Sequence, residues 1–245
     1  MLITSLDNDK IKNYVKLKDR KYRKKTNTFI VEGMHLVEEA IKEDLVIELI
    51  VEKDTKISTS LPIVYVTKEI INKISEMESP SNIMALCKIR ESNIVGDKIL
   101  MLDEIQDPGN LGTIIRSAKA FNVDTIVLSP NTVDIYNPKV IRATQGMVFH
   151  TNIVIKDLIP TIDELKQNEI PIYGTKVDNG KDVRELKAND KNKYCLIMGN
   201  EGNGVSKEIL DKCDVYLYIK MNKNVESLNV GVATSILLYE LNKGD

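Results

Sequence analysis

Aromatic residues and cysteine are scarce in this sequence: among 245 residues there is no tryptophan and there are only three phenylalanines. Proteins that bind single-stranded nucleic acid on broad aromatic platforms need such rings, so that binding mode is disfavoured. The three cysteines, an odd number, are widely spaced at Cys87, Cys195 and Cys213. They suit a reducing compartment and indicate neither a disulfide framework nor a zinc site.

Long apolar runs are missing as well. No stretch of about 18 apolar residues exists, so the sequence predicts no membrane span, and the N-terminus lacks the apolar core of a signal peptide. We therefore expect a cytoplasmic protein. The two histidines, His35 and His150, have no orienting partner in the sequence. Without a Ser/His/Asp arrangement, paired acids or metal-ligand spacing, chemistry that needs a strong nucleophile or a metal is disfavoured, and no metal is expected.

Positive charge is concentrated in one place. The net charge is −2, yet residues 16–25, "KLKDRKYRKK", contain seven lysines and arginines and a single acid, Asp19. A basic cluster on an otherwise acidic chain can contact phosphates. It can equally be a solvated helix end, and charge alone leaves both interpretations open.

The first ninety residues have the pattern of a small α/β domain. Residues 1–25 are expected to form a basic helix followed by a loop. The apolar spacing beyond them predicts strands at 28–33, 46–53, 61–67 and 83–89 and helices at 34–43 and 68–77. A polar stretch at 90–98 then separates this part from the rest. We therefore expect one domain over residues 1–92 and a second over residues 98–245.

The second part begins with a strand, a helix and a strand, at 99–103, 111–121 and 125–129, with Asn110 expected to cap the helix. A βαβ unit of this kind predicts a parallel sheet. Apolar patterning predicts further strands at 152–156, 171–175, 194–199 and 215–220 and helices at 139–145, 160–168, 206–212 and 228–242.

Three loops at the carboxyl ends of the predicted strands are candidate site loops: residues 107–118, 199–206 and 220–229. In open α/β sheets ligands bind beyond the strand carboxyl ends, so the loops are expected to share one site. The glycines of the second loop, "GNEGNGVS", permit close approach to a ligand. Alone, that loop also fits an ordinary turn, because the G-x-G-x-x-G fingerprint and the Walker lysine are absent.

Two details of these loops favour a site. Arg116 follows Asn110 by six positions on the same predicted helix and has apolar neighbours. An arginine near a buried region needs an anionic partner, and its fork suits a phosphodiester. The stretch "ESLN" at 226–229 leads into an apolar helix, and capping that helix requires only one of Ser227 and Asn229.

The three loops, in this order and at this spacing, resemble the three motifs of the SpoU (TrmH-type) RNA 2′-O-methyltransferases of the SPOUT superfamily. The motifs read "DPGNLGTIIRSAKAFNV", "LIMGNEGNGVS" and "IKMNKNVESLNVGVATSILLYEL", and the resemblance covers about residues 99–243. The preceding stretch "RKYRKKTNTFIVEGMHLVEEAI" looks like the ribosomal-protein-like α/β substrate-binding domain of many members. One departure is Lys220, where the family usually has a proline that rigidifies the strand exit.

The resemblance implies a deep trefoil knot in the catalytic domain, a homodimer formed through that domain and S-adenosylmethionine (SAM) as methyl donor. It implies that Arg116 orients or deprotonates the ribose 2′-hydroxyl and that the other catalytic positions are Asn110, Glu201, Ser227 and Asn229. The implied donor-binding residues are Gly199, Ile219, Met221 and Leu228. The basic segment supplies the expected RNA contacts Arg20, Lys21, Arg23, Lys24 and Lys25.

The function expected from the sequence is therefore SAM-dependent 2′-O-methylation of RNA, with ribosomal RNA (23S) favoured over transfer RNA. A non-enzymatic RNA-binding or ribosome-assembly protein that acts through residues 16–25 is the alternative, and retention of all five catalytic positions argues against it. A Rossmann-type oxidoreductase is a third possibility, which the missing fingerprint disfavours. The apolar stripe Val232, Ile236 and Tyr239 fits either a dimer interface or core packing.

Overall fold

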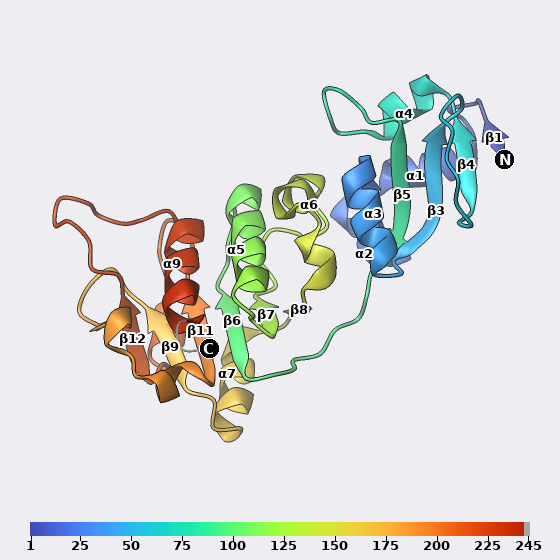
Figure 1. Ribbon diagram of the computed structural model, residues 1–245. Coiled ribbons are helices and arrows are strands. Elements are labelled where there is room, and N and C mark those ends of the chain that lie inside the picture. The colour runs from blue at the N-terminus through green and yellow to red at the C-terminus, as the bar shows by residue number, and fades with distance from the viewer. Residues whose placement is uncertain (243–245) are drawn as a thin grey trace. The chain divides into compact units, whose positions relative to one another are not determined.

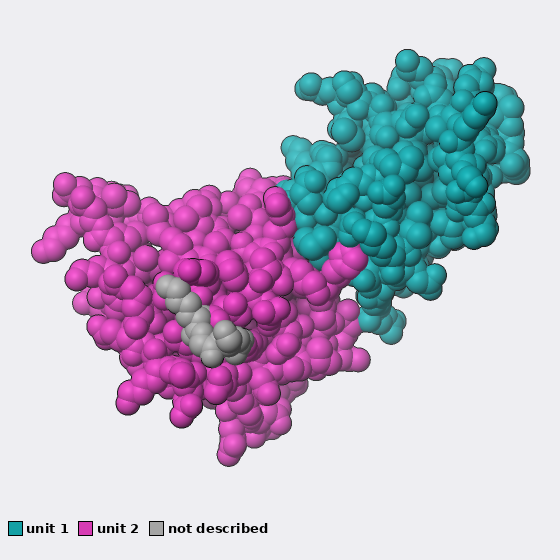
Figure 2. All heavy atoms as spheres, in the orientation of Figure 1, with its two compact units in different colours: residues 1–91, 136–149 teal, residues 92–135, 150–245 magenta. Residues whose placement is uncertain are grey.

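The computed structural model describes residues 1–242, which form two compact units. The N-terminal unit consists of residues 1–91 together with 136–149, and the C-terminal unit consists of residues 92–135 and the chain from 150 onward (Figure 2). Both are α/β structures built on one sheet each. No helix within residues 1–242 is both long and apolar enough to cross a membrane.

The N-terminal unit has a mixed five-stranded sheet in the order β1-β4-β3-β5-β2 (Figure 1). Its first three strands in that order are parallel, whereas β5 runs antiparallel to both of its neighbours. The strands are β1 (Leu2–Ile3), β2 (Thr28–Glu32), β3 (Val46–Glu52), β4 (Ile63–Val66) and β5 (Ile83–Lys88).

The described part of this unit before residue 92 contains the helices α1 (Asp9–Lys16), α2 (Arg20–Thr26), α3 (Met34–Lys42) and α4 (Lys68–Ile74). Ile50, Val64 and Met84 of the sheet share one buried cluster with residues of α1 and α4. The expectation of a single basic helix in residues 1–25 is wrong. Two short helices form instead, because Asn8 and Asp19 each accept a hydrogen bond from a backbone N–H two residues on and so begin separate helices.

A segment distant in sequence completes the N-terminal unit: α6 (Pro138–Thr144) and the 3₁₀ turn η1 (Met147–His150). The Phe29 ring of β2 lies 4.5 Å from that of Tyr136 and 6.0 Å from that of Phe149, measured between centroids. The His35 Nε2 atom of α3 lies 3.3 Å from the Gln145 carbonyl oxygen. Residues 136–149 thus pack against β2 and α3.

The C-terminal unit has a seven-stranded sheet in the order β10-β12-β9-β11-β6-β7-β8, and every pairing in it is parallel (Figure 1). The parallel α/β architecture expected from the sequence is confirmed. The strands are β6 (Lys98–Leu102), β7 (Thr125–Leu128), β8 (Ile153–Ile155), β9 (Ile172–Thr175), β10 (Lys181–Asp182), β11 (Tyr194–Met198) and β12 (Val215–Tyr218).

Apolar residues on both faces of this sheet are buried, as parallel sheets require. Alternate residues such as Ile99 and Ile197 join a cluster with α7 (Leu158–Gln167) and α8 (Lys207–Leu210). The intervening residues, including Leu100 and Leu196, are also fully buried and point to the opposite face. The remaining elements are α5 (Pro108–Ala120), α9 (Val230–Asn242) and the 3₁₀ turns η2 (Val183–Glu185) and η3 (Ala188–Lys191).

Helices α5 and α9 pack closely against each other. Ser117 and Ser235 share a hydrogen bond of 2.7 Å between their hydroxyl oxygens. A Cβ atom at Gly231 would lie 3.2 Å from the Thr113 side chain, so the glycine permits this close approach. This contact fixes the starts of the two helices relative to each other, and both starts belong to the candidate site.

Candidate active site

The site lies where the strand order changes direction. From β6 the chain continues to β7 and β8 on one side, whereas β11 and β9 lie on the other, so the loops after β6 and β11 leave the sheet side by side. The Asp103 N–H donates to the Met198 carbonyl at 2.9 Å, and the Ser206 N–H donates to Asp103 Oδ2 at 2.9 Å. These bonds join the ends of β6 and β11, from which the first and second motif loops leave the sheet.

The second motif loop, residues 199–206, is folded tightly on itself. Asn200 and Gly204 exchange two backbone hydrogen bonds, and Asn200 Oδ1 accepts the Gly202 N–H at 2.8 Å. A Cβ atom at Gly199 would overlap the backbone of Gly204 and Val205. Position 199 therefore requires glycine because the end of β11 runs directly against the returning loop.

Glu201 links this loop to the first motif. Its Oε1 atom accepts hydrogen bonds from Asn110 Nδ2 at 3.0 Å and from the Asp107 N–H at 3.1 Å. Its Oε2 atom accepts the Gln106 N–H at 3.2 Å. One carboxylate thus organises the turn that precedes α5.

Asn110 and Asn229 continue the network to the third motif. Asn229 Nδ2 donates to Asn110 Oδ1 at 2.8 Å, while Asn229 Oδ1 accepts the N–H groups of Gly231 and Val232 at 2.9 and 3.2 Å. Asn229 therefore caps α9 and also bonds to the first motif. The chain Glu201–Asn110–Asn229 connects all three motif loops.

The expected capping role of Asn110 is wrong. Helix α5 begins at Pro108, and Asp107 is its cap, with Asp107 Oδ1 accepting the Asn110 N–H at 2.8 Å. Proline is favoured in the first helical position because it has no N–H to satisfy and its φ is already helical. The Asn110 side chain is therefore available for Glu201 and Asn229.

The environment of Glu201 favours its charged form. Partial burial raises the pKa of this carboxyl, but hydrogen bonds from the Asn110 side chain and from the backbone N–H groups of Asp107, Glu201 and Gln106 outweigh burial. The net effect lowers the pKa of Glu201 below its usual value. The carboxylate thus stays ionised and holds its donors at neutral pH.

A pH dependence follows from this shift. Because the pKa of Glu201 is lowered in the folded state, its stabilising contribution is present above the unfolded pKa, about 4.3, and is lost as pH falls through the folded pKa. The stability difference between wild type and Glu201→Gln should therefore shrink as pH drops below about 4. Carboxyl-carbon NMR titration and denaturant unfolding measure both quantities. Glu208→Gln, at an exposed position, is the matched control, and a Glu201 pKa at or above the usual value would contradict the prediction.

Arg116 lies on α5, about 9 Å along the helix axis from Asn110, given the 1.5 Å rise per residue. Its neighbours Ile114 and Ile115 are buried, whereas Arg116 itself is exposed. Its guanidinium makes no hydrogen bond or ion pair with any residue in 1–242. The fold itself therefore does not supply the anionic partner that the apolar neighbours indicated, and the arginine is accessible to a ligand.

Of the other expected site residues, Gly199 follows β11, Ile219 and Met221 follow β12, and Ser227 and Leu228 precede α9. Gly199 is buried, Ile219, Met221 and Leu228 are half-buried, and Ser227 is exposed in a loop of exposed residues. Sequence reasoning missed Asp107, Gln106 and Asn200. The Asp-Pro pair at a helix start is a signal that could have identified Asp107. Turns favour asparagine beside glycine, so Asn200 could also have been identified.

Within residues 1–242, no group of three or more His, Cys, Asp or Glu side chains could hold a metal ion.

The apolar side chains of Ile219, Met221 and Leu228 are half-buried in the segment between β12 and α9. Such a surface suits a ligand with an apolar body and polar edges. The geometry therefore indicates a parallel α/β protein with a candidate ligand site at the sheet switch point. That site consists of amides, one carboxylate and an accessible arginine, and it suits group transfer by orientation.

The chain belongs to the SpoU rRNA methylase family, whose model matches residues 97–239. The model of the MRM3-like substrate binding domain matches residues 8–85. The fold is thus a SPOUT-type methyltransferase structure preceded by a substrate-binding domain, as the sequence predicts.

Relatives match nearly the whole chain. The 23S rRNA (guanosine(2553)-2′-O)-methyltransferase RlmP of Bacillus subtilis is 40% identical over 98% of both chains. An rRNA methyltransferase structure from Sinorhizobium meliloti is similar with a TM-score of 0.88 and 27% identity, covering 99% of this chain and 97% of that one. The AdoMet-bound structure of an rRNA methyltransferase from the same organism has a TM-score of 0.87 and 26% identity, with the same coverage.

Proposed function

We propose that this protein is a SAM-dependent RNA ribose 2′-O-methyltransferase that acts on ribosomal RNA in the cytoplasm, with 23S rRNA as the favoured substrate. The observation that carries the proposal is the Glu201–Asn110–Asn229 chain, which joins the three motif loops at the start of α5, the helix that carries the exposed Arg116. The activity named for the Bacillus subtilis relative, at 40% identity over nearly the full length, supports the choice of RNA.

The methyl donor would lie against Gly199, Ile219, Met221 and Leu228. When bound, SAM supplies an electrophilic methyl group, so the protein needs no metal and no nucleophile of its own. The half-buried apolar side chains suit the adenine ring and methionine chain, and the backbone of the two loops suits their polar edges. The AdoMet-bound structure of the Sinorhizobium meliloti enzyme supports SAM as the methyl donor.

The catalytic side chains act by orientation. Because the arginine guanidinium is a permanent cation, we assign Arg116 to a substrate phosphate and to the ribose 2′-oxygen, whose negative charge grows as the hydroxyl proton passes to solvent water. Asn110 and Glu201 hold the turn that starts α5, and Asn229 holds the start of α9. Ser227 contacts the substrate from the third motif loop. Fixing the acceptor oxygen in line with the methyl group provides most of the rate enhancement.

The proposal includes two domains, a ribosomal-protein-like domain over residues 1–92 and a catalytic domain over residues 98–245. It also includes a deep trefoil knot in the catalytic domain and a homodimer formed through α9. Val232 and Tyr239 of α9 are 47% and 51% exposed, so they are not core residues. That exposure favours the interface interpretation of the apolar stripe over core packing.

The RNA surface of the N-terminal unit is proposed to include Arg20, Lys21, Lys24 and Lys25. The three lysines are exposed on α2. Arg23 is a correction: it is only 4% exposed, and its Nη1 atom donates to the Leu17 and Lys18 carbonyls at 2.7 Å. Arg23 therefore stabilises the α1–α2 turn and is removed from the RNA-contact set.

The test of the proposed function uses labelled-methyl SAM with transcribed 23S rRNA, transfer RNA and DNA of matched sequence. We expect label only in ribosomal RNA, at an alkali-resistant linkage, because DNA lacks the 2′-hydroxyl. Equal labelling of DNA would contradict ribose methylation. Absence of both label and SAM binding would support the non-enzymatic alternative.

A salt-dependence prediction tests the basic surface. Replacing Lys21, Lys24 and Lys25 by glutamine should flatten the plot of log affinity against log salt by about 2, since each phosphate contact contributes about 0.7 on a single strand. Fluorescence anisotropy with labelled RNA at several salt concentrations measures the slope. The matched control replaces three other exposed lysines of the same unit by glutamine: Lys53, Lys56 and Lys73. An unchanged slope in the first variant would place the RNA surface elsewhere.

A further inference from the structure

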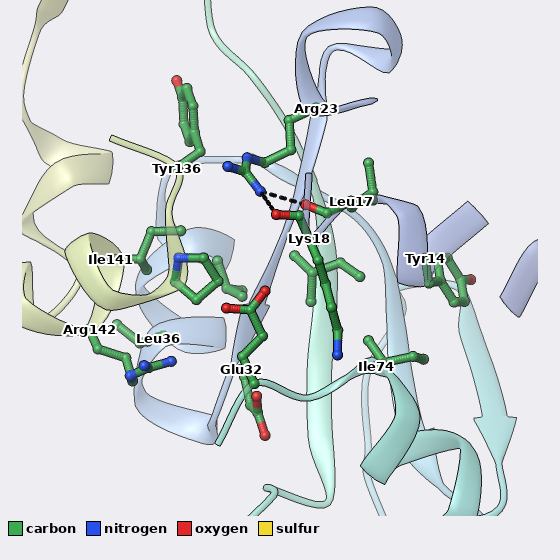
Figure 3. Close-up of a pocket in the computed structure, with 14 residues that line it drawn as sticks. Tyr14, Leu17, Lys18, Arg23, Glu32, Leu36, Ile74, Tyr136, Ile141 and Arg142 are labelled. Atoms are coloured by element: carbon green, nitrogen blue, oxygen red, sulfur yellow. Dashed lines mark hydrogen bonds between the residues drawn. The ribbon is translucent and has the colours of Figure 1, made fainter. Parts of the chain in front are cut away.

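The N-terminal unit contains a small pocket that none of the motif loops touches. Side chains from the α1–α2 turn, β2, α4 and α6 line it (Figure 3). We name it the β2 pocket and define it by its five charged side chains and two apolar ones: Lys18, Arg23, Glu32, Glu76, Arg142, Leu36 and Ile141. It combines charged groups of both signs with apolar walls.

Glu32, the last residue of β2, provides the acceptor of the pocket. Its carboxylate accepts the Ser75 hydroxyl at 2.7 and 2.8 Å and the Ser81 N–H at 2.9 Å. These two donors fix the carboxylate in place, yet a carboxylate offers about four acceptor positions. Glu32 is therefore preorganised and retains capacity for a ligand's N–H groups.

Donors stand on either side of this acceptor. Figure 3 shows Glu32 between Lys18 and Arg142. Lys18 Nζ donates to the Ser75 carbonyl at 2.8 Å, which holds it at the pocket. Arg142 is half-buried on α6, and its guanidinium makes no hydrogen bond or ion pair with residues 1–242. The pocket thus presents one fixed acceptor, Glu32, and one available donor, Arg142.

Charged groups of both signs beside apolar walls indicate which class of ligand the β2 pocket suits. A bare phosphate would face the carboxylates of Glu32 and Glu76, and a simple cation would face Lys18, Arg23 and Arg142. A nucleobase satisfies both requirements, because its faces are apolar and its edge carries N–H donors beside acceptors. Guanine fits best: its adjacent ring N–H and amino N–H match one carboxylate, and its carbonyl oxygen matches a cationic donor.

We propose that the β2 pocket receives the edge of one unstacked guanine of the RNA substrate, with Glu32 as acceptor and Arg142 as donor. This inference rests on the proposed function and adds a specificity subsite to it. Glu32 lies in the region that matches the substrate-binding domain, whereas Arg142 lies in the region that matches the methylase family. A bound guanine would therefore touch both regions at once.

The first measurement is saturation-transfer NMR on the full-length protein with the monophosphates GMP, AMP, CMP and UMP. We expect contacts to the guanine ring of GMP, weakened at least fivefold in Glu32→Gln and in Arg142→Gln. The matched controls are Glu38→Gln and Lys139→Gln, exposed positions on α3 and α6 that do not line the pocket. Equal signals from all four nucleotides, or GMP signals unchanged in both variants, would overturn the proposal.

The second measurement is steady-state methyl transfer to 23S rRNA. We expect Arg142→Gln to raise KM about tenfold while kcat stays within twofold, because the subsite binds RNA away from the reacting atoms. Since Glu32 also holds Ser75 and Ser81, thermal unfolding of both variants separates misfolding from lost recognition, and Arg142→Gln decides the question if Glu32→Gln is unstable. If the wild type transfers methyl groups and Arg142→Gln has the same KM as the wild type, the guanine subsite is overturned while the proposed function stands. Absence of wild-type transfer counts against the proposed function, and the nucleotide NMR still decides the subsite.

Discussion

Arg116→Ala should lower the rate of methyl transfer at least 100-fold while leaving SAM affinity within about twofold. The expected size follows from losses seen when one preorganised donor to a developing oxyanion is removed, about 10²–10³-fold. Arg116 is exposed and has no partner within residues 1–242, so its removal breaks no bond of the fold. The defect should therefore appear in kcat and not in stability.

Single-turnover transfer to 23S rRNA and calorimetric SAM binding check this result. Lys119→Ala is the matched control, since Lys119 is an exposed cation on the same helix, three residues further on. It should retain nearly full activity. Comparable turnover in Arg116→Ala would remove this arginine from the reaction.

Gly199→Ala should have the second large effect, a loss of SAM affinity of more than tenfold together with reduced stability. The added methyl group would overlap the backbone of Gly204 and Val205, which cannot rotate away as a flexible side chain can. Overpacking of this kind typically costs about 1–3 kcal/mol or shifts the backbone. Because the loop carries Glu201, a shift would also disturb the bonds from Glu201 to Asn110 and Asp107.

Gly202→Ala provides a control within the same loop. A Cβ atom there would lie 3.4 Å from Asn200 Oδ1, which is an ordinary contact. Urea unfolding and SAM titration of both variants should therefore separate them clearly. Equal behaviour of the two variants would show that the close approach at Gly199 does not shape the donor site.

Periodicity and turn chemistry predicted much of the architecture. Five of the seven strands of the C-terminal sheet are four or five residues long and largely apolar, a pattern that depends only on neighbouring residues. The site loops could be located for the same reason, since strand carboxyl ends are where open sheets bind ligands. The two-residue strands β1 and β10 escaped detection because they are too short to show alternation.

Side-chain partners were harder to predict. Asn110 was expected to cap α5, yet Asp107 does so, and the partners of Asn110 lie 91 and 119 residues away at Glu201 and Asn229. The sequence does not distinguish Arg23 from the exposed basic residues beside it, but the geometry of the α1–α2 turn buries its side chain. Such pairings depend on tertiary contacts that no local pattern encodes.

The interleaving of the two units constrains how this protein can be recombined. Residues 136–149 lie within the methylase match but pack with β2 and α3, where Phe29 contacts Tyr136 and Phe149. A chimaera that exchanges only residues 1–91 with those of a relative would place foreign side chains against these native rings. Active hybrids should therefore require the exchange of both pieces together, because the N-terminal unit is built from two separated stretches of the chain.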